Sequence, residues 1–77
     1  MNYPITKDAA KTIQSMDSST RRRVYDGINK LPAGDVKKLR GYQYSYRLRI
    51  GDWRIIFTMI GQDISIDDVL PRGDAYK

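Results

Sequence analysis

Two arginines alternate with apolar residues along residues 44–50, and a third arginine follows directly after a Gly-Asp dipeptide. Strict alternation predicts a β-strand, in which Arg47 and Arg49 share one face. A type II′ hairpin turn requires glycine at the first of its two central positions, so Gly51-Asp52 predicts a tight reversal. That reversal pairs residue 50 with residue 53 and sets Arg49 directly across from Arg54, with all three guanidinium groups on one face.

The chemistry of such a cluster would be directed at phosphates. Like charges placed opposite each other destabilise a sheet, so stability alone gives little reason for Arg49 to face Arg54. A fixed cluster of guanidinium groups would hold a phosphodiester and stabilise the charge that develops on its oxygens during transfer. The alternative is a set of solvated arginines that pair with Asp52 or Asp67.

The end of the chain supplies a further cation and a phenol. A strand over residues 64–70 would run antiparallel to the strand over 53–60, so the segment after it returns near Arg54. This return places Arg72 and Tyr76 close to the cluster. Because the sequence contains neither histidine nor glutamate, the phenol is the plausible acceptor for the proton of a ribose 2′-hydroxyl. A tyrosine packed at the chain end, without a chemical role, is the alternative.

Other basic residues fit binding better than chemistry. Lys37, Lys38 and Arg40 precede the first long strand. They are candidates for contacts with RNA phosphates, which fix position without reading sequence. A basic run at residues 21–23 opens a helix, where it opposes the helix dipole and is typical of a solvated surface.

Tyrosines at positions 42, 44 and 46 are candidates for a platform on which RNA bases stack. Tyr46 falls on the apolar face of the predicted strand, so we assign it to the core, together with Trp53. The sequence leaves open whether Tyr42 and Tyr44 stack on bases or are merely exposed.

A metal site is not expected. Asp67 and Asp68 are adjacent, so in a regular strand their carboxylates point to opposite faces of the sheet. The chain therefore predicts neither a Mg²⁺ site nor a cofactor. Strict alternation from Ile64 and Ile66 would turn Asp68 inward, so a β-bulge or the end of pairing is expected near it.

The helices and strands that must position these side chains can be read from the sequence in order. Residues 2–6 predict a short strand, and Asp8 is expected to cap a helix over residues 9–16. A polar cluster at 17–20 starts a second helix, which residues 32–35 end. Strands over 44–50, 53–60 and 64–70 complete a β-α-α-β-β-β order. This order predicts an α+β fold, with a helical hairpin packed on a small twisted antiparallel sheet.

Length and charge limit the class of protein. The 77 residues predict one domain, 1–77, and the absence of cysteine suits a reducing cytoplasm. Fourteen Lys+Arg against nine acidic residues give a net charge of +5, which favours a nucleic-acid partner over a membrane. No apolar run approaches the roughly 20 residues of a membrane span, and the N-terminal residues lack a signal-peptide pattern. We expect a cytoplasmic protein.

These residues resemble a known family. The segment Leu39-Arg40-Gly41, followed by residues 46–57, resembles the signature of RelE-type toxins from type II toxin–antitoxin systems. The closing residues 69–76 are similar to that family's terminal Arg-x-x-x-Tyr segment. The opening strand and the two helices stand in the same order, so the resemblance covers nearly the whole chain.

The resemblance implies a metal-independent endoribonuclease that inhibits translation. Such toxins enter the A site of the small ribosomal subunit and cut mRNA there, because the 2′-hydroxyl attacks the adjacent phosphate. The resemblance also implies a cognate antitoxin, which would cover the basic surface with a segment that folds on binding.

The same resemblance implies roles for individual residues. Arg47 and Arg49 match the two basic positions of the first hairpin strand, which are lysines in some members. Arg54 matches the basic residue that binds and stabilises the phosphate. Arg72 matches the arginine near the leaving group, and Tyr76 matches the C-terminal tyrosine that stacks on a base or takes a proton.

The chain also departs from the family pattern. Leu70-Pro71 stands where many members carry Gly-His. Because guanidinium groups stay protonated, proton transfer falls to Tyr76 or to ribosomal groups. Two alternatives remain: a ParE-like poison of DNA gyrase, which shares the fold but lacks the nuclease cluster, and an RNA-binding module without catalysis, which would tolerate loss of Tyr76.

Overall fold

Polar side chains set where both helices begin in the computed structural model, which describes residues 3–71. The Thr6 hydroxyl accepts a hydrogen bond from the Ala9 amide at 3.2 Å, and α1 (Lys7–Gln14) follows it. Asp17 caps α2 (Ser18–Asn29) in the same way. The expectation that Asp8 is the first cap is wrong: Asp8 lies in the first turn of α1, where its negative charge faces the positive end of the helix dipole.

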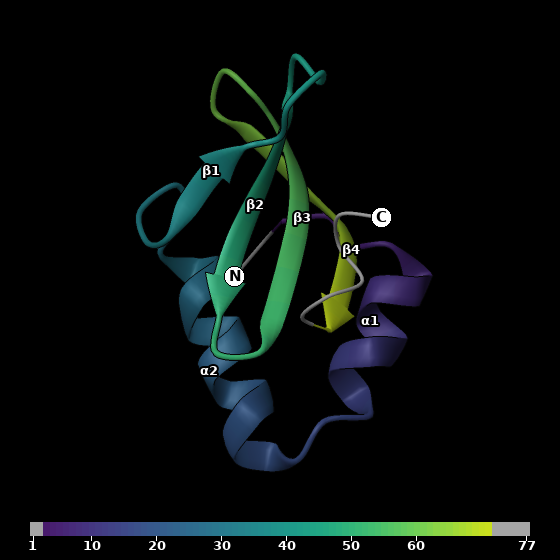
Figure 1. The fold of residues 1–77 in the computed structure, drawn as a ribbon. Helices are drawn as coiled ribbons and strands as arrows, with labels where there is room; N and C mark the ends of the chain where they lie inside the picture. The colour runs from purple at the N-terminus through teal and green to yellow at the C-terminus, as the bar shows by residue number, and fades with distance from the viewer. Residues whose placement is uncertain (1–2, 72–77) are drawn as a thin grey trace.

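A four-stranded antiparallel sheet follows the helices, with its strands side by side in chain order (Figure 1). α1 packs beside β4 and α2 beside β2, which confirms the α+β class and the helical hairpin on an antiparallel sheet. The strands are β1 (Val36–Lys38), β2 (Ser45–Ile50), β3 (Trp53–Ile60) and β4 (Asp63–Pro71).

The order of the elements differs from expectation at two places. The predicted strand over residues 2–6 is reduced, within the described residues, to one parallel bridge between Ile5 and Ile66. Pro4 has no amide hydrogen to donate, and its carbonyl oxygen accepts from the Ile66 amide at 2.8 Å. A short strand, β1, stands where no strand was expected. The observed order is therefore α-α-β-β-β-β rather than β-α-α-β-β-β.

The register of the β2–β3 hairpin is the one that the sequence predicts. Ile50 pairs with Trp53 and Arg49 with Arg54. Gly51 has a φ of +56°, whereas Asp52 does not have a positive φ, because within residues 3–71 only glycines do. A type II′ turn requires this combination at its two central residues. The hairpin therefore directs its fully buried apolar residues to one face, and its arginines, together with Ile56, to the other.

The helices cover the apolar face of this sheet. The Tyr46 and Phe57 rings stack there with their centroids 5.5 Å apart, so the assignment of Tyr46 to the core is confirmed, although its side chain is half-buried. Each large apolar side chain that the core buries fully contributes about 1.5–3 kcal/mol. The largest fully buried side chains are Ile13, Val24, Ile28, Leu48, Ile55, Phe57, Ile66 and Val69.

A β-bulge interrupts β4 at Asp67, as the conflict at Asp68 predicts. Ile56 pairs with Asp68 and Phe57 with Ile66, so Asp67 is the extra residue between the two pairs. Its carboxylate accepts a 2.6 Å hydrogen bond from the Thr58 hydroxyl. The bulge turns Asp68 away from the core.

The described residues add two observations about metals and membranes. Within residues 3–71, no group of three acidic side chains lies close enough together to hold a metal ion. No helix in the same range is long and apolar enough to cross a membrane.

Asp17 ties helix capping to pH. The Thr20 side chain and backbone amide both donate to its carboxylate, and these hydrogen bonds hold the pKa of Asp17 below its usual value of 3.8. The resulting stabilisation is complete above pH 3.8 and is lost as the pH falls through the lower folded-state pKa.

We expect Asp17→Asn, which still caps the helix, to lower the melting temperature at pH 7 and to converge on the wild type in acid. Thermal melts from pH 7 to pH 2.5 measure this effect. Asp26→Asn in the same helix is the control, and a difference that stays constant with pH would contradict the explanation.

Gly27 allows α2 to approach β2 closely. A Cβ atom at this position would collide with the Ile50 side chain. Replacing a helical glycine with alanine stabilises by about 1 kcal/mol, whereas overpacking costs about 1–3 kcal/mol. Ile50→Val removes the colliding methyl group, so we expect Gly27→Ala to be about 1 kcal/mol more favourable in that background than in the wild type. Urea unfolding of the wild type, the two single variants and the double variant measures the coupling free energy between the two positions. If the two single changes in unfolding free energy simply add up in the double variant, the collision is refuted.

Candidate active site

The face of the sheet opposite the helices carries a basic groove of about 840 Å³. Every basic residue that the sequence predicts for the site, and that the structure describes, lines it. These residues are Lys37, Lys38, Arg40, Arg47, Arg49 and Arg54. The groove therefore gathers six positive charges from β1, β2, β3 and the loop after β1.

The pleat of the sheet explains how the groove is assembled. Lys37 of β1 pairs with Arg47 of β2, and Arg49 of β2 pairs with Arg54 of β3. Directly paired residues point to the same face, so these four side chains form two rows across three strands. Arg47 is only 6% exposed, whereas half of the Arg49 side chain is in solvent.

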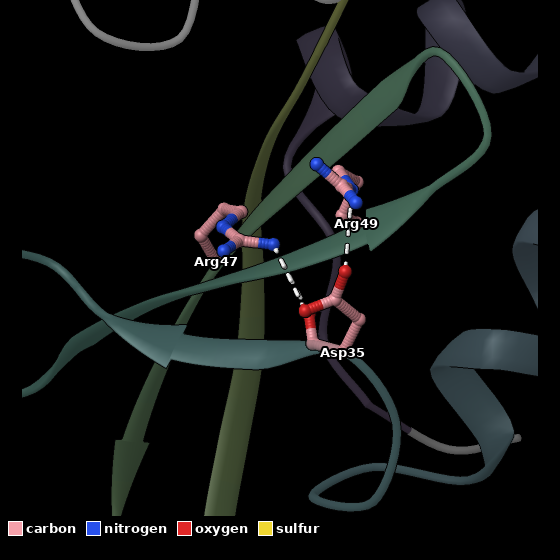
Figure 2. A network of polar contacts seen from close by, with 3 residues as sticks. All are labelled: Asp35, Arg47 and Arg49. Atoms are coloured by element: carbon pink, nitrogen blue, oxygen red, sulfur yellow. Dashed lines mark hydrogen bonds and ion pairs between the residues drawn. The ribbon is translucent and has the colours of Figure 1, made fainter.

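A carboxylate bridges the two arginines of β2. Asp35 Oδ1 lies 3.4 Å from Arg47 Nη1, and Oδ2 lies 3.2 Å from Arg49 Nε (Figure 2). Two backbone contacts strengthen this bridge, because the Asp35 carbonyl oxygen accepts from the Arg49 amide at 3.0 Å and from Arg47 Nη1 at 3.3 Å. Arg49 thus has a carboxylate on the β1 side and a second guanidinium group on the β3 side.

Asp35 corrects an interpretation drawn from the sequence. The alternative of solvated arginines named Asp52 and Asp67 as their partners, but Arg47 and Arg49 both form ion pairs with Asp35, and Asp67 accepts a hydrogen bond from Thr58. The missed signal was the two-residue spacing between Asp35 and Lys37, which places both on the face that carries the arginines once β1 is recognised as a strand.

Arg47 is a fixed positive charge beneath the groove. Its Nε is buried and has no hydrogen-bond partner within residues 3–71. Burial of a charged group costs several kcal/mol unless it is paired and hydrogen-bonded, and Asp35 offsets that cost only in part. Guanidinium groups in proteins act as fixed charges rather than as bases.

The described chain ends beside the arginine cluster. Leu70 pairs with Arg54 and Pro71 with Trp53, so β4 returns to the hairpin end where the sequence predicts it. Arg72 and Tyr76 lie outside the described residues, and their places in the site remain predictions.

The groove is suited to electrostatic stabilisation rather than to proton transfer. Lysine and arginine side chains supply its charge, and neither histidine nor glutamate exists in the chain. Such a surface holds a phosphodiester and stabilises negative charge that develops on it. Its arginines cannot accept a proton, so that step needs a different group.

The role of Asp35 is testable by removing its charge. Asp35→Asn leaves Arg47 buried without an anionic partner, so we expect a loss of about 1–2 kcal/mol in unfolding free energy. The expected loss of unfolding free energy is smaller than for a fully buried ion pair, because the Asp35 side chain is 47% exposed and solvent screens the interaction. Asp52→Asn at the exposed hairpin turn is the matched control and should cost less than about 0.5 kcal/mol. Equal stability of the two variants in urea unfolding would remove Asp35 from the explanation.

Comparison with known proteins finds archaeal toxins similar to this chain. No family model matches the chain. Toxin RelE3 of Methanocaldococcus jannaschii is 40% identical over 42 residues, which cover 54% of this chain and 48% of that toxin. The alignment therefore spans about half the length of the curated relative.

Solved structures match over nearly the whole chain. The RelB–RelE antitoxin–toxin complex from Methanococcus jannaschii matches with a TM-score of 0.78 and 26% identity, over 95% of this chain and 94% of that one. The archaeal RelE–RelB complex from Pyrococcus horikoshii OT3 matches with a TM-score of 0.74 and 32% identity, over 97% and 100%. The YoeB dimer of Staphylococcus aureus, at 19% identity and a TM-score of 0.67 over 88% and 92%, supports the fold alone.

The fold and groove define a small RelE-like α+β domain. With 32% identity across the full length of the Pyrococcus toxin chain, the chain belongs to the RelE family of toxins from toxin–antitoxin systems.

Proposed function

We propose that this chain is a ribosome-dependent, metal-independent endoribonuclease that cuts mRNA in the A site of the small subunit and so inhibits translation. The observation that supports this most directly is the gathering of Arg47, Arg49 and Arg54 in one groove of a RelE-family chain. A groove of fixed cations is what a phosphodiester substrate needs for binding and for charge stabilisation.

In the proposed reaction, the ribose 2′-hydroxyl loses its proton and its oxygen attacks the adjacent phosphorus. The bond from phosphorus to the 5′-oxygen breaks, and that oxygen takes up a proton, leaving a 2′,3′-cyclic phosphate and a 5′-hydroxyl. Arg49 and Arg54 would bind the non-bridging oxygens, since both line the groove. Arg47 would act from beneath them as a fixed positive charge.

Proton transfer is assigned to the end of the chain. Tyr76 would accept the proton or stack on a base, and Arg72 would stabilise the leaving oxygen. The return of β4 to Arg54 supports this placement, because the described chain ends next to the cluster. Ribosomal groups are the second source of proton transfer, which would make cleavage depend on the ribosome.

The proposed partners follow from the same family. Two matched structures are complexes of RelE with RelB, which supports a cognate antitoxin for this chain. An acidic or amphipathic antitoxin segment would neutralise the basic groove by folding over it. The proposed mRNA and ribosome partners of this chain would place it in the cytoplasm.

Primer extension on translated mRNA tests the proposal with Arg54→Ala and Tyr76→Phe. We expect ribosome-dependent cuts from the wild type and at least about a 100-fold loss of cleavage rate in Arg54→Ala, because a preorganised charge is removed. Tyr76→Phe should lose cleavage as well if the phenol accepts the proton. Arg22→Ala on α2, an exposed arginine that does not line the groove, is the matched control and should cut like the wild type.

Other outcomes would redirect the assignment. Inhibition of DNA supercoiling without RNA cuts would indicate a gyrase poison. RNA binding without cuts, and without dependence on Tyr76, would indicate a binding module that lacks catalysis.

A further inference from the structure

Tyr42 is an exposed aromatic residue on the wall of the basic groove. Its surface is 62% exposed, and it lines the groove together with the cations described above. Its hydroxyl makes no hydrogen bond to any residue in the range 3–71. Single exposed aromatic residues are common on protein surfaces, so the exposure matters here because of what surrounds it.

A tight turn fixes the backbone that carries Tyr42. The Tyr42 amide donates to the Leu39 carbonyl oxygen at 3.3 Å, and Gly41 between them has a φ of +83°, the conformation that a type II turn requires at its third residue. The Leu39 amide in turn donates to the Ser45 carbonyl oxygen at 2.9 Å, which ties the loop to β2. Tyr42 is therefore held at the groove by hydrogen-bonded backbone on both sides.

The neighbouring tyrosines are placed differently. Tyr46 stacks on Phe57 on the core side of the sheet. Tyr44 is 44% exposed and belongs to the same loop, but it does not line the groove. Of these three tyrosines, Tyr42 is the one that combines exposure with a place beside the cations.

We propose that Tyr42 is the stacking platform for one base of a single-stranded RNA whose phosphates lie along the basic groove. The inference rests on the proposed function and names a residue that would position the substrate. Proteins that bind single strands combine a positive groove for the backbone with aromatic side chains for the bases. The six lining cations suit the regularly spaced phosphates of a polyanion, and an exposed ring beside them suits a base.

Fluorescence anisotropy with a labelled 2′-O-methyl RNA hexamer tests the platform, since that RNA cannot be cut through its 2′-oxygen. We expect Tyr42→Ala to weaken binding about tenfold, the loss of one stacked base, while Tyr42→Phe binds like the wild type because its ring still stacks. Tyr44→Ala is the matched control from the same loop and should bind normally. An otherwise identical hexamer in which every nucleotide is abasic should bind wild type and Tyr42→Ala equally, because only the base contact is lost.

Several results would overturn the platform. The first is that Tyr42→Ala binds the hexamer as tightly as the wild type, or that the wild type does not bind it at all. The second is that Tyr42→Phe or Tyr44→Ala loses as much affinity for the hexamer as Tyr42→Ala. Weakened antitoxin binding with unchanged RNA binding would assign Tyr42 to the protein partner instead. Thermal melts of each variant exclude unfolding as the cause. Failure of cleavage in primer extension, with hexamer binding intact, would sink the proposed reaction and leave the platform standing.

Discussion

The two-residue reversal at Gly51-Asp52 determines which side chains of β2 and β3 face water. Because side chains alternate along a strand, a slip of one residue in this pairing would move the arginines toward the helices and the core residues toward solvent. The penalty for burying three guanidinium groups without partners is far larger than the free energy of one turn, so the observed register is strongly preferred. The core and the basic groove are two consequences of the same pairing.

The groove concentrates positive charge at a cost that Asp35 reduces. Arg49 faces Arg54 across the hairpin, an arrangement that repulsion disfavours. The Asp35 carboxylate, on the opposite flank of Arg49, also contacts Arg47 and so links the strand that begins at residue 36 to both arginines. A phosphate that entered the groove would meet arginines whose orientation is already fixed, and it would compete with this internal carboxylate for Arg49.

The parts of the structure that the sequence predicts well are those that depend on neighbours in the chain. The hairpin register follows from local alternation and from one glycine, and the bulge follows from a conflict between that alternation and an inward Asp68. Lys37 reaches the groove by another route, because β1, which the sequence does not predict, pairs with β2 and sets Lys37 beside Arg47.

Other features depend on contacts between distant segments. Three residues are too few to display a periodicity, so β1 was missed, and Asp35 was missed with it. Thr6 and Asp8 are both competent caps, and the hydrogen bond from the Thr6 amide to the Ile66 carbonyl oxygen decides between them. The residues around the cap do not reveal this hydrogen bond, because its acceptor is about sixty residues further along the chain.

The extra residue at Asp67 divides β4 into two halves of opposite parity. Before it, even-numbered residues such as Ile64 and Ile66 are buried, and after it the odd-numbered Val69 takes their place. Loss of Asp67 would leave Ile66, Asp68 and Val69 in consecutive register with the same β3 partners, so the remaining strand would keep its inside and its outside and lose only the bend. A deletion in the exposed turn at Gly61 would shorten a loop, whereas the same deletion at position 67 would turn a bulged strand into a regular one.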